Sequence, residues 1–242
     1  CGDTYVDDYV YKTGHTDNDN DVYCDVCKEY VYIATGTCGD NLTWTFNEST
    51  DTLTISGTGD MYDYQGNTAP WQDYKPSIKK VIICDGVTSI GESAFTACKN
   101  LESVTIGNDV TEIGLNAFNS CENLKTVVMG DSVETIGEQA FFYCESLTSV
   151  IIPDSVTRIG DSAFMYCGAL ETVTMGSGVE KVGHDAFYLC KKLKDVYYNG
   201  SEAEWQNIYF LFGMDSFLAN ATIHFAIPSG TCGDNLTWEY DE

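Results

Sequence analysis

The chain has 242 residues, of which 43% are hydrophobic and 13% aromatic, and its formal net charge is −25. This length and apolar content suffice for one or two domains with a buried core, which argues against global disorder. The negative charge repels phosphate backbones and anionic lipid headgroups, so we expect no nucleic-acid partner. No apolar run approaches the roughly 20 residues that a bilayer-spanning helix needs, so we expect no membrane insertion. Because no signal-peptide pattern opens the chain, we expect an already processed segment.

The first 33 residues contain a cluster of metal-ligand side chains. Cys24 and Cys27 have the C-x-x-C spacing of half a zinc site, and Cys1 and His15 would complete four ligands. A second C-x-x-C motif is absent from the sequence. The same spacing also suits an exposed disulfide or a redox-active pair, so zinc is one of several interpretations.

A calcium loop is the next alternative for this segment. Asp17, Asp19 and Asp21 resemble the start of such a loop. Val22, however, stands where the sharp turn needs Gly, and Lys28 stands where a bidentate Glu belongs. A solvated acidic linker is the simplest interpretation of the same residues, and it requires no metal.

The segment before the repeats has the pattern of a β-hairpin. Residues 42–46 and 53–55 alternate apolar with polar side chains, and the turn-like run N-E-S-T-D separates them. A degenerate repeat with an apolar strand follows at residues 78–86. We expect the hairpin to cover this first repeat, with Trp71 and Tyr74 sealing the junction.

Five units of 23 residues then recur, each with the pattern V-x-x-[IV]-G-x-x-A-F-x-x-C-x-x-L-x-x-V. The repeated Phe and Leu must point inward, and no single unit can bury them alone. Stacked units bury them together, so stability is a sum of contacts between neighbours. The repeated aromatic position is Phe95, Phe118, Phe141, Phe164 and Phe187.

Within each unit, three segments have distinct patterns. The run L-x-x-V-x-[IM] has the alternation of a short strand, and adjacent copies predict one long parallel sheet. The repeated Gly, as in Gly91, marks a bend where a side chain would crowd the turn or where φ is positive. The A-F-x-x-C segment has the spacing of a single helical turn, so we expect short helices or 3₁₀ turns on the convex side.

The pattern I-G-x-x-A-F-x-x-C-x-x-L resembles the BspA-like (Treponema-type) leucine-rich repeats of bacterial surface proteins. With its flanks the resemblance covers residues 34–228, because the segments at 38–44 and 197–205 are similar to those that often bracket such repeats. The resemblance implies extracellular adhesion or host-protein binding, and secretion or display on a bacterial surface.

The predicted fold class is α/β and β-rich. It is a leucine-rich-repeat solenoid with a parallel concave sheet, short convex helical turns, a β-hairpin N-cap and a helix-strand C-cap. For the C-cap, Ser201 to Glu204 fits a capping box with Trp205 and Ile208 on one face of the helix it opens, and residues 221–225 predict a closing strand.

An octapeptide occurs twice, at residues 37–44 and 231–238. Because chance does not supply eight identities, we expect a second module to start near Ser229. The predicted organisation is a linker or small metal-binding segment at 1–33, an N-terminal cap and degenerate repeat at 34–86, five repeats at 87–201, a C-terminal cap at 202–228 and the following module at 229–242.

The cysteines of the repeats form a column at intervals of 23 residues. Five equivalent positions cannot all pair, and Cys is a favoured small buried residue, so we expect structural thiols. Cys38, Cys84 and Cys232 lie outside the column. A bridge between Cys38 and Cys84 is the alternative to two further thiols.

The predicted strands leave two rows of outward side chains on the concave sheet. The apolar half of the second row forms a β-branched stripe suited to an extended polypeptide or a glycan, although β-branched residues also simply suit exposed strands. The candidate binding residues in the two rows are Ser103, Thr105, Thr126, Val128, Ser149, Ile151, Thr172, Thr174, Asp195 and Tyr197.

Catalysis has little support in the sequence. The three histidines are His15, His184 and His224, and none has a nucleophile at motif spacing. Cys190 follows His184 closely, but it belongs to the buried column. We therefore expect no enzyme activity and no cofactor apart from the alternative of zinc.

The sequence favours an adhesive module that binds a host extracellular-matrix protein, another surface protein or a glycan through the concave face. The alternative is a structural spacer that presents another domain of a longer surface protein. The sequence does not determine the oligomeric state.

Overall fold

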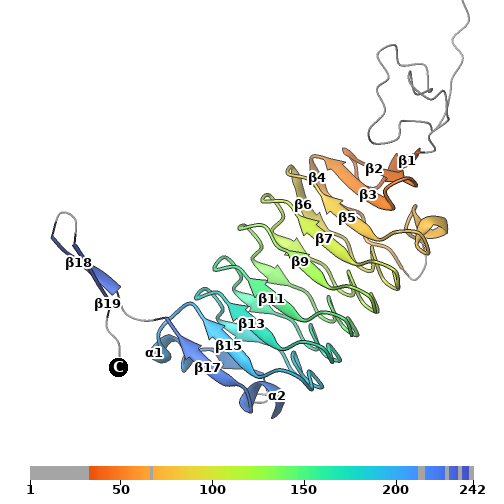
Figure 1. The fold of residues 1–242 in the computed structure, drawn as a ribbon. Coiled ribbons are helices and arrows are strands. Elements are labelled where there is room, and N and C mark those ends of the chain that lie inside the picture. Colours follow the sequence, from red (N-terminus) through yellow and green to blue (C-terminus); the bar gives the residue numbers. More distant parts are fainter. Residues whose placement is uncertain (1–32, 66–67, 212–215, 227–228, 234–235, 240–242) are drawn as a thin grey trace, which may run out of the picture.

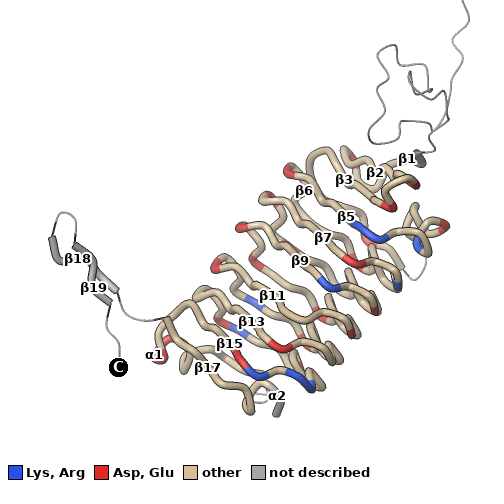
Figure 2. Tube along the Cα trace, viewed as in Figure 1, with Lys and Arg blue, Asp and Glu red and all other residues tan. Residues whose placement is uncertain are grey.

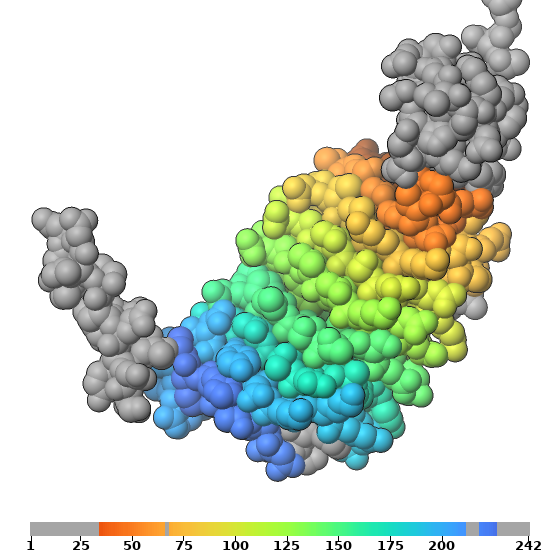
Figure 3. Space-filling view, viewed as in Figure 1, coloured from red at the N-terminus to blue at the C-terminus, as the bar shows by residue number. Residues whose placement is uncertain are grey.

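A computed structural model describes residues 33–65, 68–211, 216–226, 229–233 and 236–239. Figure 1 shows the chain winding into a stack of similar turns between an N-terminal hairpin and a C-terminal strand. In Figure 3 the turns lie side by side in chain order along the stack. The predicted solenoid is therefore confirmed.

Each turn contributes one longer strand to the same side of the solenoid, which we call the broad sheet. These strands are parallel, and equivalent residues of successive repeats are paired, as Val104 with Val127 and Val173 with Val196. The inward apolar residues are buried in β3 to β15 and half-buried in β17, and the outward residues are exposed or half-buried. The broad sheet comprises β3 (Thr52–Gly57), β5 (Lys80–Ile83), β7 (Ser103–Ile106), β9 (Thr126–Val128), β11 (Ser149–Ile152), β13 (Thr172–Met175), β15 (Asp195–Tyr198) and β17 (Thr222–Phe225).

A second parallel sheet, which we call the narrow sheet, was not predicted. The V-x-x-[IV] run that opens each repeat also pairs with its copies, as Ile113 with Ile136. A pair of extended residues is sufficient to form this sheet because every neighbouring repeat supplies the same pair. The narrow sheet comprises β4 (Gly59–Asp60), β6 (Val87–Ile90), β8 (Glu112–Ile113), β10 (Thr135–Ile136), β12 (Arg158–Ile159), β14 (Lys181–Val182) and β16 (Tyr209–Phe210).

The A-F-x-x-C segments form hydrogen-bonded turns, so the predicted convex helical turns are wrong. Ser93 and Ala97 have positive φ values of 56° and 59°, and equivalent residues in the other repeats do the same. A right-handed helix cannot continue through such residues. The N–H of Phe95 instead donates to the Ala117 oxygen of the next repeat at 2.8 Å. We call this third set of bonds between repeats the turn ladder.

The repeated phenylalanines stack through the interior, as predicted. Neighbouring ring centroids from Phe95 to Phe187 lie 5.1–5.3 Å apart, with interplanar angles of 6–9°. All five rings are fully buried. Burial of one such side chain stabilises the fold by about 1.5–3 kcal/mol. The spine therefore contributes to every contact between repeats.

The repeated glycines are required by close approach. A Cβ on Gly114 would lie 2.6 Å from the Ile90 oxygen, and one on Gly137 would lie 2.7 Å from the Ile113 oxygen. None of the five repeat glycines has a positive φ. Of the two reasons expected for these glycines, crowding rather than positive φ is correct, because each bend packs on the bend of the preceding repeat.

The predicted hairpin is confirmed, and one strand precedes it. β1 (Ile33–Thr37) pairs antiparallel with β2 (Leu42–Asn47), which pairs antiparallel with β3. A 3₁₀ helix, η1 (Gln72–Tyr74), follows before the first repeat. Trp71 continues the phenylalanine spine, with its ring centroid 5.2 Å from that of Phe95.

The N-terminal cap also completes the turn ladder of the first repeat. The Tyr64 N–H donates to the Glu92 oxygen at 2.8 Å. The Trp71 indole donates to the Ala94 oxygen at 3.0 Å. The Lys75 ammonium donates to the Thr96 oxygen at 2.8 Å. These three donors replace the backbone N–H groups that a preceding repeat would supply.

The C-terminal cap begins with the predicted capping box. Ser201 and Glu204 form it at the start of α1 (Glu202–Trp205), which is one turn long. Trp205 packs edge-on against Tyr198, with ring centroids 5.3 Å apart. A second short helix, α2 (Ser216–Ala219), precedes β17, which matches the predicted closing strand.

The duplicated octapeptide forms the same backbone pairing twice. β18 (Ser229–Gly233) pairs antiparallel with β19 (Leu236–Glu239). Thr231 pairs with Thr237 as Thr37 pairs with Thr43. This agreement of register supports the interpretation of residues 229–242 as the start of a following module, which stays a prediction.

Trp71→Phe tests the cap of the turn ladder, because it removes the indole donor and leaves the Ala94 oxygen unbonded. We expect a loss of about 1–3 kcal/mol in the free energy of unfolding from this group. Trp44→Phe is the matched control. The buried Trp44 Nε1 has no hydrogen-bond partner within the described residues, so this change loses ring volume alone. Urea unfolding measures both variants, and equal losses would contradict the capping role.

Candidate binding face

All ten predicted binding residues lie on the outward side of the broad sheet, with exposed or half-buried side chains. Strand pairing aligns them in the two predicted rows on each side of the joint between β9 and β11, which are not paired. Ser149 pairs with Thr172, and Thr172 with Asp195, in the first row. Thr105 pairs with Val128 in the second row. These residues therefore face outward as predicted, and their use in binding stays a prediction.

The second row contains an unusual exposure of apolar side chains. Val128 is 51% exposed, Ile151 65% and Tyr197 46%. The other exposed large hydrophobic residues of the described chain are Tyr62 and Tyr209, which lie outside this row. Scattered exposed hydrophobics need no explanation, but three in one row on one face form a patch.

His224 joins the C-terminal end of this face. Its ring stacks on that of Tyr197, with centroids 4.6 Å apart and an interplanar angle of 13°. Its Nε2 lies 2.8 Å from Asp195 Oδ1. Sequence reasoning placed His224 in the closing strand without a role, because β17 follows β15 by 27 residues and departs from the repeat interval of 23.

The broad sheet is divided between β9 and β11. One part comprises β1, β2, β3, β5, β7 and β9, the other comprises β11, β13, β15 and β17, and the described residues show no pairing between the two. The prediction of one long sheet from the L-x-x-V-x-[IM] strands is therefore wrong. Before β9, the Lys125 N–H donates to the Glu102 oxygen at 2.9 Å. The corresponding bond from Thr148 to Lys125 is absent within the described residues. We call this feature the sheet split.

Pro153 stands at the end of β11, beside the split. At the two joints that follow, the equivalent N–H completes the ladder: Gly176 donates to the Ile152 oxygen and Asn199 to the Met175 oxygen, both at 2.9 Å. Proline has no N–H and cannot make such a bond to Met129. The split therefore coincides with the loss of a ladder donor.

The split is confined to the broad sheet. Across the same joint β8 pairs with β10 in the narrow sheet. The Phe118 N–H donates to the Ala140 oxygen at 2.8 Å in the turn ladder. The rings of Phe118 and Phe141 remain 5.3 Å apart. The solenoid is thus continuous behind a local opening of one face.

A cleft of about 280 Å³ lies at the split. Its apolar walls come from the two strands on either side and from the residues that follow them. Asp131, Asp154 and Asn199 form its polar rim. The apolar lining residues are Val127, Val128, Met129, Ile151, Ile152 and Pro153.

Charges differ between the two edges of the broad sheet (Figure 2). At the edge where the strands begin, charges alternate between repeats, with Lys125 Nζ 2.9 Å from Glu102 and Lys194 Nζ 3.9 Å from Glu171. The equivalent residue in the repeat that follows the split is Thr148, which carries no charge. Exposed pairs of this kind contribute about 0–1 kcal/mol each.

The edge where the strands end is acidic. The turns that follow β5, β7, β9 and β11 carry Asp85, Asp109, Asp131 and Asp154. Asp154 Oδ1 accepts a hydrogen bond from the Ser177 N–H at 2.8 Å. This bond, with the Asn199 amide, lowers the pKa of Asp154, so its carboxylate is fully ionised at neutral pH.

The cysteine column is buried, as predicted. Cys121 Sγ donates to the Phe95 oxygen at 3.3 Å, and Cys190 Sγ donates to the Phe164 oxygen at 3.2 Å. Cys38 and Cys84 are both thiols, so the alternative of a bridge between them is wrong. The column has a structural role, because four of its thiols bond to the turn of the preceding repeat: those of Cys121, Cys144, Cys167 and Cys190.

The predicted metal segment, with Cys1, His15, Cys24 and Cys27, lies outside the described residues, and zinc there stays a prediction. Within the described ranges no cluster of three or more His, Cys, Asp or Glu side chains is arranged to hold a metal ion. Likewise, no helix in the described part of the chain has the length and hydrophobicity to cross a bilayer.

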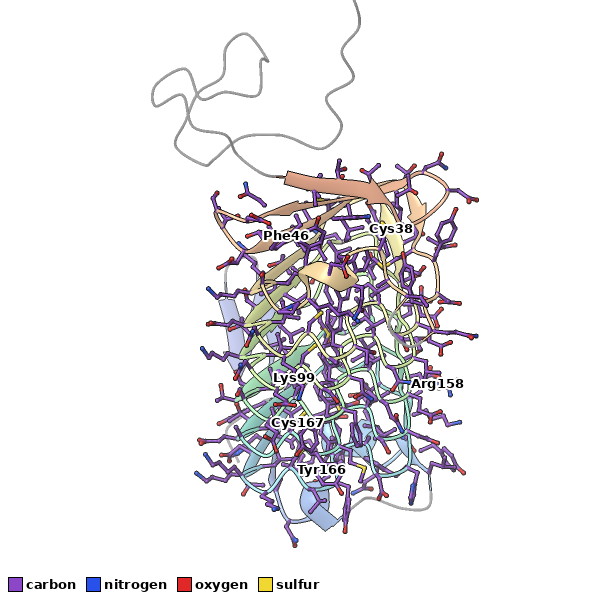
Figure 4. All side chains as sticks on the ribbon, turned by 90° about the vertical axis from the view of Figure 1, so that its right-hand side faces the viewer. Cys38, Phe46, Lys99, Arg158, Tyr166 and Cys167 are labelled. Atoms are coloured by element: carbon purple, nitrogen blue, oxygen red, sulfur yellow. The ribbon has the colours of Figure 1, made fainter. Side chains whose placement is uncertain are left out.

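An aromatic cluster on the turn ladder was missed by the sequence analysis. The Phe142 and Tyr166 rings lie edge to face at 5.4 Å, and Tyr143 lies 5.7 Å from Tyr166. Tyr166 is labelled in Figure 4 on the side that carries the turns. The sequence contains a signal for this cluster. The two positions between the repeated Phe and Cys are small or polar in the first two repeats, whereas the third and fourth repeats have aromatic residues there.

Comparison with known families agrees with this architecture. Residues 73–194 match the BspA type leucine rich repeat region in six copies. This match covers half of the chain. The chain belongs to the BspA-type leucine-rich-repeat family.

Solved structures share the fold of this BspA-type chain. A leucine-rich repeat protein from Bacteroides ovatus is 23% identical with a TM-score of 0.55, over 72% of this chain and 42% of that protein. The pneumococcal vaccine antigen PcpA is 16% identical with a TM-score of 0.51, over 75% of this chain and 40% of that one. The chain thus spans less than half the length of either. No curated protein matches it significantly.

The burial of the cysteine column predicts a selective pattern of alkylation. Burial raises the pKa of Cys98 to about 12 and that of Cys121 well above its usual range, and the thiolate is the reactive form. Iodoacetamide at pH 8 should therefore modify the half-buried Cys84 in the folded chain and the column only in denaturant. Peptide mass spectrometry measures this order, and equal labelling of Cys84 and Cys121 in the folded chain would contradict it.

The split predicts uneven hydrogen exchange along the broad sheet. Without pairing to β9, the amides of Ser149 and Ile151 should exchange faster than those of Thr172 and Thr174, which occupy the paired β13. Hydrogen–deuterium exchange resolved to single amides measures the difference. Equal protection in β11 and β13 would mean that the sheet is continuous in solution.

Proposed function

We propose that this chain is a secreted or cell-surface module of a bacterium that binds a protein or glycan ligand through the broad sheet. The observation that supports the proposal most directly is the exposure of Val128, Ile151 and Tyr197 in one outward row. Fixed strands hold these side chains, so little conformational entropy is lost when they contact a ligand. A host extracellular-matrix protein is the leading class of ligand.

The surrounding surface suits recognition rather than catalysis. The rows are mainly Ser and Thr, which add hydrogen-bonding groups around the apolar residues. His184 lies beside the carboxylate of Asp185, and His224 lies beside that of Asp195. We therefore propose a non-enzymatic role.

A structural spacer is the second candidate function. It is favoured by the repeated hairpin register of β1–β2 and β18–β19, which suits modules arranged in series. A spacer would need the solenoid for length and stiffness alone. It would not need the apolar row, so changes in that row distinguish the two functions.

Replacing Val128, Ile151 and Tyr197 together with Ala should weaken binding to solubilised host extracellular matrix at least tenfold, because centrally placed apolar contacts dominate interface energies. Their exposure predicts little change in melting temperature. Surface plasmon resonance and a glycan array measure the two ligand classes. Tyr209→Ala, an exposed aromatic on the narrow sheet, is the control. Unchanged binding by the triple variant would reject the broad-sheet site and favour the spacer.

A further inference from the structure

The cleft at the sheet split is a pocket on the broad face, at the joint where β9 and β11 are not paired. The residues on either side, Val128 and Ile151, are the most exposed aliphatic side chains of the row. Between them the cleft continues inward to Met129, which is half-buried, and to Ile152, which is buried. One apolar side chain inserted from outside would meet aliphatic surface on both walls.

The pocket is held open by a continuous framework. The narrow sheet, the turn ladder and the stack of Phe118 on Phe141 all continue behind the split. The walls therefore keep their spacing when no ligand is bound. Preformed pockets of this kind bind without the free-energy cost of ordering their own residues.

The charge at the pocket determines which partner suits it. Asp131 and Asp154 are exposed carboxylates at its rim. Within the described residues neither has an ion pair with Lys, Arg or His. The whole chain carries a formal charge of −25, which favours approach of a cationic partner and repels an anionic one.

We propose that the sheet split binds a polypeptide through one apolar side chain in the cleft and a neighbouring Lys or Arg at Asp131 and Asp154. This inference rests on the proposed function, since it names the ligand chemistry that the broad face selects. It specifies a basic segment of a protein, and a glycan would not satisfy both the apolar cleft and the acidic rim.

Selection from a random-peptide phage library on the full chain tests the proposal. The selected peptides should place Leu, Ile, Met or Phe within two residues of Lys or Arg. Fluorescence polarisation with a selected peptide should show at least tenfold weaker binding to Ile151→Ser. The double variant D131N/D154N should bind about three- to tenfold more weakly, and 500 mM salt should weaken binding to the wild-type chain.

Matched controls separate the cleft from the rest of the face. Ile82→Ser changes the same outward row two strands away from β9 and should bind the peptide normally. Asp85→Asn changes another carboxylate of the acidic edge, outside the cleft, and should also bind normally. A thermal melt of each variant confirms that it is folded.

Three results would overturn the proposal: no selected peptide, selected peptides without enrichment of basic residues, or equal binding to wild type and Ile151→Ser. The function itself is tested separately with Tyr197→Ala, whose residue lies outside the cleft. If this variant loses matrix binding while D131N/D154N retains it, the face is functional and the inference about the split is wrong. If neither variant changes matrix binding, both the proposed function and the inference about the split are wrong.

Discussion

Stacking of identical side chains at one strand spacing, about 4.8 Å, is the constraint on which the structure depends. The phenylalanine rings lie 5.1–5.3 Å apart and nearly parallel, and each is buried only because its neighbours cover it. A bulkier or differently placed residue in any repeat would displace two interfaces at once. This packing requirement explains why the side chains recur at an interval of 23 residues. The backbone bonds of the broad sheet, the narrow sheet and the turn ladder follow from the same geometry.

This constraint explains which features could be predicted. Inward positions repeat, so Phe118, Leu124 and Cys121 were placed correctly from spacing alone, and the outward rows followed from strand alternation. The turn conformation could not be predicted. Ala97, Ser120 and Tyr143 all have positive φ, and apart from Asn116 the left-handed residues of the repeats are mostly types that rarely adopt it. Contacts with the next repeat impose this conformation, and a local pattern carries no trace of them.

The candidate site shows the same division. The ten outward residues were found because the strands repeat, whereas His224 was missed because the last strand departs from the interval. The split was missed for another reason. Pro153 and Thr148 are visible in the sequence, yet the effect of each depends on a bond that only the neighbouring repeat can supply or accept. Sequence reasoning from one repeat at a time does not reach such paired properties.

A regular solenoid offers its ligands a uniform surface, and specificity must come from departures from the repeat. The interior tolerates few departures because the spine and the bends are close-packed. Outward positions and ladder donors tolerate more, since the regular joints are connected by three sets of backbone bonds. Loss of pairing in the broad sheet is therefore compensated by the narrow sheet and the turn ladder. This redundancy allows a repeat protein to open a pocket on one face without weakening the stack that holds the pocket's walls.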